Sequence, residues 1–539
     1  MKINVLSIAL LWLMLGAPCP NNAGTCVLAQ KGVMPNPNGF PVQATVTGGV
    51  IEGDYDNKTG IQTYFGVPFA QPPVGKLRWK APQTVKPWTA VKQTKTFGPR
   101  PVQQFMWPDM IFRSAGLSED CLYLNVWTPA THKDKDLPVL VYFYGGGNIA
   151  GGGSEYRYDG EAMASEGIVV VTVNYRLNLF GYFAHPELSK QAPYRASGNY
   201  GALDQSFALA WVHDNVAAFG GSPDRITIAG ESAGSMAVSL HMASPLSRNN
   251  IAGAIGESGA LINPTGPPVP LAEGEQIGVD FVEKTGYSFA EFRELPTATL
   301  FELYREHNTY FPIVLDDHLL SKSLPEIYAA GEQAQVPLLL GWNSAELPAA
   351  AFAKAPFQRA DFDKTIREKL GDKADRAARL YAGDNGRELE QSISDFGSDT
   401  WLVYGTWKWF DLHRGHSDRP VYRYLYAKLR PADDKGELTP AIGAPHACEI
   451  EYALGNLDLV PGWNWTDDDR KVSATMKGYF ANFIKTGDPN GGDLPAWPFA
   501  SDPTDDTPPV MVIDVESKAV NAENDARYRL LDEHYHPKR

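Results

Sequence analysis

The chain has 539 residues, of which 43% are hydrophobic, and its formal net charge at pH 7 is -15. This composition supplies a sizeable core, and we expect one large globular domain. Acidic residues number 63 against 48 basic ones, and no long basic run is present. The charge balance therefore disfavours nucleic acid and anionic membranes as partners.

The N-terminus has the features of a secretory signal. Lys2 is followed by an apolar block over residues 5–17, which is too short to span a bilayer. The small residue Ala29 marks the preferred cleavage site, with Ala23 as a second choice, while a buried N-terminal helix is the alternative. We predict a signal peptide over 1–29, export to the periplasm or the medium, no stable membrane insertion, and a single domain over 30–539.

Only two of the 4 cysteines, Cys121 and Cys448, would remain after cleavage. An exported protein of this size does not depend on disulfides for stability, so we expect two free or buried thiols. The cysteine spacing gives no metal site.

The first half of the chain alternates strand and helix signals. Residues 48–55 suggest an edge hairpin, and the prolines within 61–82 predict an irregular surface path. Residues 118–127 alternate like a strand. The nearly all-apolar runs 137–144 and 167–174 predict strands that are buried on both faces.

Helical periodicity then covers residues 198–219, and later strands are expected at 336–341 and 421–426. Charged helical stretches such as 361–380 are interpreted as insertions over the top of the sheet. The order of elements predicts an α/β fold with a mostly parallel central sheet flanked by helices.

Residues 224–237 predict a strand, a tight turn and a helix. The run 226–229 is apolar and β-branched, and Gly-Glu-Ser-Ala-Gly at 230–234 turns sharply into a helix start. The two glycines let the strand and the helix approach closely, which exposes Ser232 as a candidate nucleophile. The alternative is a chance Gly-x-Ser-x-Gly match, which the flanking strand and helix disfavour.

A serine nucleophile needs donors for the oxyanion that develops during its attack. Three consecutive glycines follow the buried strand 137–144, and the amides of Gly146 and Gly147 could face a ligand there. Together with the amide of Ala233 they are candidate oxyanion donors. The alternative for the glycines is a flexible turn.

The serine also needs a base and an orienting acid. Among 11 histidines, His446 stands out because it lies in a turn after a loop, where catalytic groups are often found. Glu346 follows the strand 336–341, which places its carboxylate on the same sheet edge as Ser232. The chain order serine, acid, histidine is the one this architecture uses.

These residues resemble the type-B carboxylesterase family, the cholinesterase-like branch of the α/β-hydrolases. The resemblance runs from about Gly48 to beyond Pro498, and it rests on Tyr-Phe-Gly-Val-Pro-Phe-Ala (64–70), Glu-Asp-Cys-Leu-Tyr-Leu-Asn (119–125), Asn-Tyr-Arg (174–176), Gly-Asn-Tyr-Gly-Ala-Leu-Asp-Gln (198–205) and Phe-Gly-Gly-Ser-Pro (219–223) leading into 230–234.

The resemblance implies an α/β-hydrolase fold and ester hydrolysis without a cofactor. It matches Ser232, Glu346 and His446 to the catalytic serine, acid and base of the family. The remaining matches are the oxyanion donors Gly146, Gly147 and Ala233, the ion pairs Arg78 to Glu119 and Arg176 to Asp204, and Ser258 as a support for Glu346.

Three features depart from the family pattern: one missing cysteine and two substituted positions. Cys121 matches a half-cystine, but the partner expected upstream near residues 100–104 is absent, so that disulfide is not expected. Asn148 stands where an aromatic residue usually follows the glycines, and Leu347 stands where a glycine follows the acid. Both are predicted to contact substrate and to affect the acyl preference.

Among exported bacterial members, the chain looks like esterases of fumonisin-type substrates, which are long amino-polyols bearing tricarballylate groups. The net negative charge would repel such an acyl group, so a local cation is needed. Arg157, in a loop expected to overhang the site, is our hypothesis for that contact. The alternatives are a general carboxylesterase or lipase of other ester specificity, and a non-catalytic cholinesterase-like binding protein.

Overall fold

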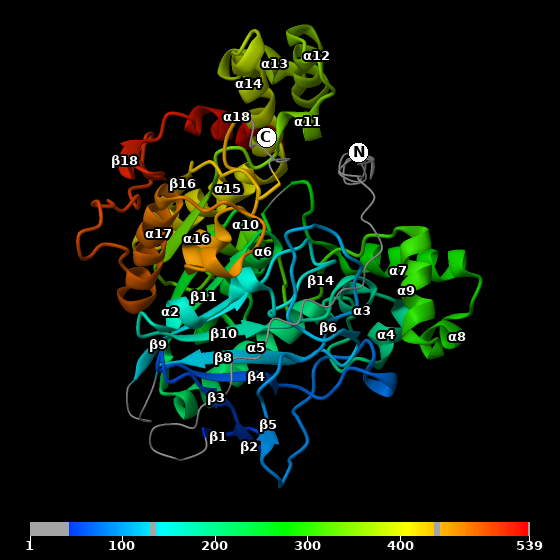
Figure 1. Cartoon of the computed structure of the whole chain (residues 1–539). Helices are drawn as coiled ribbons and strands as arrows, with labels where there is room; N and C mark the ends of the chain where they lie inside the picture. Colours follow the sequence, from blue (N-terminus) through cyan, green and yellow to red (C-terminus); the bar gives the residue numbers. More distant parts are fainter. Residues whose placement is uncertain (1–41, 130–135, 263, 436–441, 537–539) are drawn as a thin grey trace.

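The computed structural model describes residues 42–129, 136–262, 264–435 and 442–536 (Figure 1). The predicted signal peptide, 1–29, lies outside these residues. An 11-stranded sheet forms the centre, in the order β18-β17-β16-β15-β12-β11-β9-β10-β8-β4-β3. Its strands are β3 (Asp54–Tyr55), β4 (Gln62–Pro68), β8 (Tyr123–Thr128), β9 (Leu137–Phe143), β10 (Val169–Val173), β11 (Gly221–Glu231), β12 (Gly253–Glu257), β15 (Leu338–Asn343), β16 (Val421–Tyr426), β17 (Pro509–Ile513) and β18 (Lys518–Asn521).

The middle of the sheet is parallel from β10 through β17, with antiparallel strands at both edges. Parallel strands need crossover connections, which the helices between them supply. The predicted mostly parallel sheet flanked by helices is confirmed.

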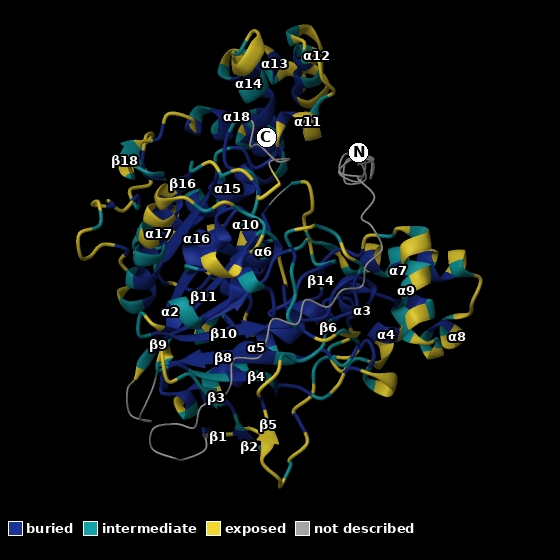
Figure 2. Ribbon diagram, in the orientation of Figure 1, coloured by how far each residue is buried: buried dark blue, intermediate teal, exposed yellow. Residues whose placement is uncertain are grey.

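Alternate residues of the central strands face two different cores, and Figure 2 shows the sheet as buried between its helices. Val139, Val141 and Phe143 of β9 pack in the core that includes α5 (Tyr200–Asn215), α6 (Ala233–Ala243), α10 (Leu324–Ala329) and α15 (Tyr404–Gly415). Leu140 and Tyr142 pack in the core that includes α16 (Ile450–Leu454) and α17 (Asp467–Thr486). Burial on both faces explains why these strands read as unbroken apolar runs.

The expected irregular path over 61–82 is wrong in its first part. Residues 62–68 form β4, which pairs antiparallel with β8. A register shift between Tyr64 and Val67 accommodates Gly66, whose amide donates to Asn125 Oδ1 at 3.0 Å. Pro68 is the last residue of the strand, where its missing N–H does little harm.

The edge hairpin predicted at 48–55 is present in part, because β1 (Gln43–Val46) and β2 (Gly49–Glu52) pair antiparallel. It belongs to a separate 3-stranded sheet with β5 (Lys92–Gln93). The remaining short elements are α2 (Glu161–Ala164), α3 (Asn178–Tyr182), α4 (Pro186–Gln191), β6 (Arg100–Pro101), β7 (Leu117–Ser118), β13 (Val269–Pro270) and β14 (Val314–Leu315).

Two helical insertions extend from this core (Figure 1). The first contains α7 (Leu271–Thr285), α8 (Phe289–Glu294) and α9 (Thr297–His307). The second contains α11 (Ala349–Phe352), α12 (Arg359–Leu370), α13 (Ala374–Leu380) and α14 (Gly386–Ser398), so the helical prediction for 361–380 is confirmed as two helices. Within the described ranges, no helix is both long and apolar enough to cross a bilayer.

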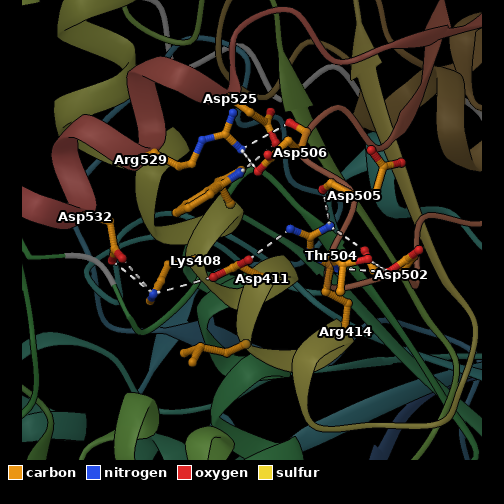
Figure 3. A network of polar contacts seen from close by, with 12 residues as sticks. Lys408, Asp411, Arg414, Asp502, Thr504, Asp505, Asp506, Asp525, Arg529 and Asp532 are labelled. Carbon is orange, nitrogen blue, oxygen red and sulfur yellow. Dashed lines mark hydrogen bonds and ion pairs between the residues drawn. The ribbon is translucent and has the colours of Figure 1, made fainter.

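The last described helix, α18 (Asp525–Tyr535), docks on α15 through polar contacts (Figure 3). Lys408 Nζ lies 3.0 Å from Asp532 Oδ1. Arg414 donates to the carbonyl oxygens of Asp502 and Asp505 at 2.9 and 3.1 Å, which fixes the loop that precedes β17. The C-terminal segment is thereby held on α15, which follows the second insertion in the chain.

Candidate active site

The turn between β11 and α6 consists of Ser232 alone. Its backbone has φ 55 and ψ -119, a combination that side-chain-bearing residues rarely adopt. Strain of this kind persists only where the surroundings enforce it. Here the Ser232 amide donates to the carbonyl oxygen of Glu257 at 2.9 Å, which ties the turn to the neighbouring strand β12.

The glycines on either side of the turn are required by close packing. A Cβ on Gly234 would lie 2.0 Å from the carbonyl oxygen of Phe143, and a Cβ on Gly230 would lie 2.5 Å from the carbonyl carbon of Gly234. The strand and the helix therefore approach each other more closely than any side chain permits. This approach leaves the half-buried Ser232 side chain at the tip of the turn.

The structure brings the three predicted catalytic side chains into one hydrogen-bonded chain. His446 Nε2 lies 2.9 Å from Ser232 Oγ, and His446 Nδ1 lies 2.6 Å from Glu346 Oε2. Glu346 is 1% exposed and follows β15, whereas His446 lies on a turn before α16. A serine, an imidazole and a carboxylate in this order can support nucleophilic attack by the serine oxygen.

Glu346 is fixed by donors to its second oxygen. Ser258 Oγ and the Asn343 amide each donate to Glu346 Oε1 at 2.6 Å. The Asn343 side chain donates to Pro445 O at 2.9 Å and to Glu449 Oε2 at 2.5 Å, which connects the acid to the loop that carries His446. Ser258 thus lies where the family resemblance implies a support for the acid.

The glycine turn after β9 lies directly beside Ser232, because Phe143 of β9 pairs with Gly230 of β11. A Cβ on Gly145 would lie 3.2 Å from Ser232 Cβ. The Gly145 amide donates to Tyr158 Oη at 3.3 Å. The amides of Gly146, Gly147 and Ala233 have no acceptor among the residues that the structure describes, an arrangement suited to binding an oxyanion.

Glu231, the residue before Ser232, is a second carboxylate beside His446. Its Oε1 lies 3.2 Å from His446 Nε2, and the residue is 2% exposed. Burial lowers the pKa of His446, but Glu231 and Glu346 raise it by more, so that the pKa is about 9. Burial in turn raises the pKa of Glu231 to about 8, and burial beside Glu346 raises that of Glu449 to about 7.

These pKa shifts predict the pH dependence of the reaction. A general base must be neutral, so kcat/KM should fall as the pH drops through the raised pKa of His446, above the ordinary value of about 6.5. Glu231→Gln removes the largest contribution that raises this pKa, so the acid limb should move down by about 1 unit or more. The measurement is kcat/KM against pH for wild type and variant, with the exposed Glu187→Gln as the control. An acid limb that stays in place in Glu231→Gln would contradict the prediction.

Two of the predicted substrate-contacting residues lie beside these groups. Asn148 directly follows the glycine turn at φ 60, and its Oδ1 accepts a hydrogen bond from Tyr182 Oη at 3.1 Å. Leu347 directly follows Glu346. Its amide donates to Ser398 Oγ at 2.9 Å and its carbonyl oxygen accepts from Ser394 Oγ at 2.8 Å, so α14 holds the backbone just after the acid.

The hypothesis for Arg157 is not supported by its surroundings, because the side chain is buried instead of overhanging the site. The residue is 5% exposed. Its Nη1 donates to Asp109 Oδ2 at 2.9 Å and its Nε donates to Glu155 Oε2 at 2.8 Å. Two carboxylates thus already occupy the guanidinium, and no contact joins Arg157 to the serine, the histidine or the acid in the part of the chain described.

Both ion pairs implied by the family resemblance are present. Arg78 Nη2 lies 2.6 Å from Glu119 Oε1, and Arg176 Nη2 lies 2.7 Å from Asp204 Oδ1. The two described cysteines, Cys121 and Cys448, are free and buried, as expected. Among the described residues, no group of three or more His, Cys, Asp or Glu side chains is arranged to hold a metal ion.

Sequence reasoning missed three residues at this site. Glu231 could have been noticed as a charge at the end of a buried strand, and Glu449 as a charge three residues after His446. Trp401, whose ring centroid lies 5.0 Å from that of His446, gives no such signal because it is distant in sequence and follows the second helical insertion.

Comparison with known proteins identifies the family of the chain. Residues 41–531 match the model of the carboxylesterase family. Fumonisin B1 esterase of Sphingopyxis macrogoltabida is 32% identical over 473 residues, covering 85% of this chain and 84% of that protein. Acylcarnitine hydrolase of Mus musculus is also 32% identical, over 500 residues that cover 86% of each chain.

Solved structures show the same architecture. A PNB esterase superposes with a TM-score of 0.77 at 29% identity, covering 91% of this chain and 99% of its own. A Geobacillus stearothermophilus carboxylesterase superposes with a TM-score of 0.77 at 28% identity, covering 90% and 99%. The fold is the α/β-hydrolase fold predicted above, and the chain belongs to the carboxylesterase family.

Proposed function

We propose that the protein is a serine carboxylesterase that works through an acyl-enzyme, with Ser232 as the nucleophile, His446 as the general base and Glu346 as its orienting acid. The observation that carries this proposal is the hydrogen-bonded chain of these three side chains, beside three amides that have no acceptor within the described ranges. Family membership and the named relatives support carboxylic ester hydrolysis as the activity.

In the first half of the reaction, Ser232 Oγ attacks the ester carbonyl carbon while His446 Nε2 takes its proton. The carbonyl oxygen becomes an oxyanion that the amides of Gly146, Gly147 and Ala233 stabilise. The C–O bond to the alcohol then breaks, and the leaving alkoxide takes the proton from His446.

In the second half, water replaces the alcohol. It gives a proton to His446 as it attacks the acyl carbon, and the bond to Ser232 breaks. Ser232 recovers that proton and the carboxylic acid departs. Glu346 keeps His446 Nδ1 protonated throughout and stabilises the imidazolium that forms twice per turnover.

As substrates we propose fumonisin-type tricarballylate esters, on the basis of the similarity to fumonisin B1 esterase. The equal identity to an acylcarnitine hydrolase supports a carboxylesterase of other ester specificity as the second candidate. Asn148 and Leu347 are the proposed determinants of acyl preference.

A panel of esters decides between these specificities. The purified protein would be assayed on a tricarballylate ester, a neutral ester of the same alcohol, short-chain and long-chain p-nitrophenyl esters, and one anilide. The tricarballylate ester is expected to give the highest kcat/KM. A neutral ester with a kcat/KM about 100-fold higher, equivalent to roughly 2.7 kcal/mol of transition-state stabilisation, would favour the general carboxylesterase. Absence of turnover on every ester would instead favour a non-catalytic binding protein.

We also propose that the chain is exported and processed after Ala29. The support is the charged, apolar and small-residue pattern of residues 1–29, which lie outside the described part of the chain. N-terminal sequencing of the protein recovered from the periplasm or medium is expected to begin at Gln30. A recovered protein that still begins at Met1 would contradict this proposal.

A further inference from the structure

The imidazole of His446 is held at its two nitrogens by Glu346 and Ser232, at 2.6 and 2.9 Å. Glu231 Oε1 also lies 3.2 Å from Nε2, so all of these contacts are at the two nitrogens and leave the ring able to rock about the line that joins those nitrogens. His446 lies on a turn and not on a helix or strand, so its backbone supplies little further restraint. A further contact, away from that line, is needed to fix the plane of the ring.

Trp401 provides that further contact. Its ring meets the His446 ring edge to face, with the centroids 5.0 Å apart and the planes at 67°. This is a favourable geometry for two aromatic rings.

The presentation of Trp401 depends on an unusual backbone. Residues Asp399–Val403 form a π-helical turn, η7, between α14 and α15. Such turns are rare and often lie at functional sites. The other four residues of the turn are buried, and Trp401 is the one that is half-exposed. The wider turn thus directs a single large side chain outward, toward the base.

The π-helical turn is itself anchored. Asp399 Oδ2 accepts a hydrogen bond from Tyr381 Oη at 2.8 Å and forms an ion pair with Arg527 Nε at 3.0 Å. Arg527 also donates to Asp395 Oδ2 at 2.6 Å, so α18 holds both α14 and η7. A rare backbone geometry that is held by several hydrogen bonds and ion pairs is suited to positioning a side chain accurately.

The same segment also reaches the acid. Ser394 and Ser398 of α14 hold the carbonyl oxygen and the amide of Leu347, the residue after Glu346. One continuous unit, α14 with η7, therefore contacts the loops that carry the acid and the base.

From this geometry we propose that Trp401 is a positioning residue for the base: presented by the π-helical turn, it holds the His446 ring in the plane in which its nitrogens reach Glu346 and Ser232. Its effect falls on the chemical step, because a rocking imidazole loses alignment with the serine oxygen. The proposal rests on the proposed serine esterase mechanism.

The test compares three variants on p-nitrophenyl acetate, a substrate small enough to make little contact with pocket walls. Trp401→Met keeps an apolar, adaptable side chain but removes the ring, and is expected to lower kcat about ten-fold with KM changed less than about two-fold. Trp401→Phe restores a ring and should recover most of that loss. Trp88→Leu replaces a half-buried tryptophan at the distant β1–β2 hairpin and controls for the loss of an indole.

A readout independent of turnover accompanies the kinetics. The proton that His446 Nδ1 donates to Glu346 should give a downfield imidazole NMR resonance in the wild type and in Trp401→Phe, and should broaden or disappear in Trp401→Met. The proposal is overturned if Trp401→Met keeps both its kcat within two-fold and this resonance. It is also overturned if Trp401→Phe loses as much activity as Trp401→Met with an equal fall in Tm, which would mark a structural role only. A wild type without esterase turnover would contradict the proposed function, while the resonance would still report whether Trp401 holds the ring.

Discussion

Ser232→Ala is expected to lower kcat by about a million-fold, the scale of loss found when the nucleophile of a serine hydrolase is removed. Without Oγ no acyl-enzyme can form, and His446 and the free amides can only assist a direct attack by water. KM should change little, because the hydroxyl contributes little to ground-state binding. The measurement is kcat and KM on a p-nitrophenyl ester, together with loss of labelling by an organophosphonate.

The control for this variant is Ser165→Ala, since Ser165 is exposed and bonds only within its own helix. It should retain wild-type kcat. Alanine keeps the same unfavourable φ at position 232, so Tm should remain close to that of the wild type. Turnover by Ser232→Ala within ten-fold of wild type would remove this serine from the mechanism.

Glu346→Gln is expected to lower kcat about ten-thousand-fold at neutral pH, as found when the orienting acid of a triad becomes an amide. The amide can offer an N–H to His446 Nδ1, which favours the tautomer in which Nε2 carries the proton and cannot accept one. The donors to Oε1, Ser258 and the Asn343 amide, would then face the amide oxygen and hold the wrong orientation in place.

Pre-steady-state kinetics checks this second expectation, because acylation and deacylation both need the base and should slow together. The matched control is Glu388→Gln on the exposed face of α14, which should behave as wild type. A loss below about 30-fold, or 2 kcal/mol, would mean that another carboxylate orients the base.

The nucleophile turn could be predicted from sequence because its constraints are local. An apolar strand, two glycines and a helix start specify the turn within a few residues, and the close contacts of Gly230 and Gly234 show why no other residue serves there. The acid and base could be proposed from chain order and family likeness. The distance between the serine and the acid depends on how strands β11 and β15 both pair with β12, and no local sequence pattern gives that pairing.

The errors have physical causes as well. Strand β4 was hidden by prolines that lie at and beyond its end, since a proline count does not show which backbone groups need a hydrogen bond. Arg157 was expected in a loop overhanging the site because it follows the glycine turn by ten residues, but its side chain is buried. Its two carboxylate partners, Glu155 and Asp109, make burial tolerable. Trp401 reaches the base through a π-helical turn, whose extra residue shifts a side chain away from ordinary helical spacing.

The anchoring of Asp399 by Arg527 also bears on the order in which the protein becomes active. During synthesis the ribosome releases Ser232, Glu346 and His446 well before Arg527, so a growing chain holds its reactive groups before it holds the helix that braces the π-helical turn. Because the Trp401 contact is proposed to contribute about ten-fold to kcat, a nascent chain should turn over at roughly a tenth of the full rate until α18 has docked. The full rate would then be reached only after α18 has been made, and translation products that lack this helix would hydrolyse esters more slowly inside the cell that makes them.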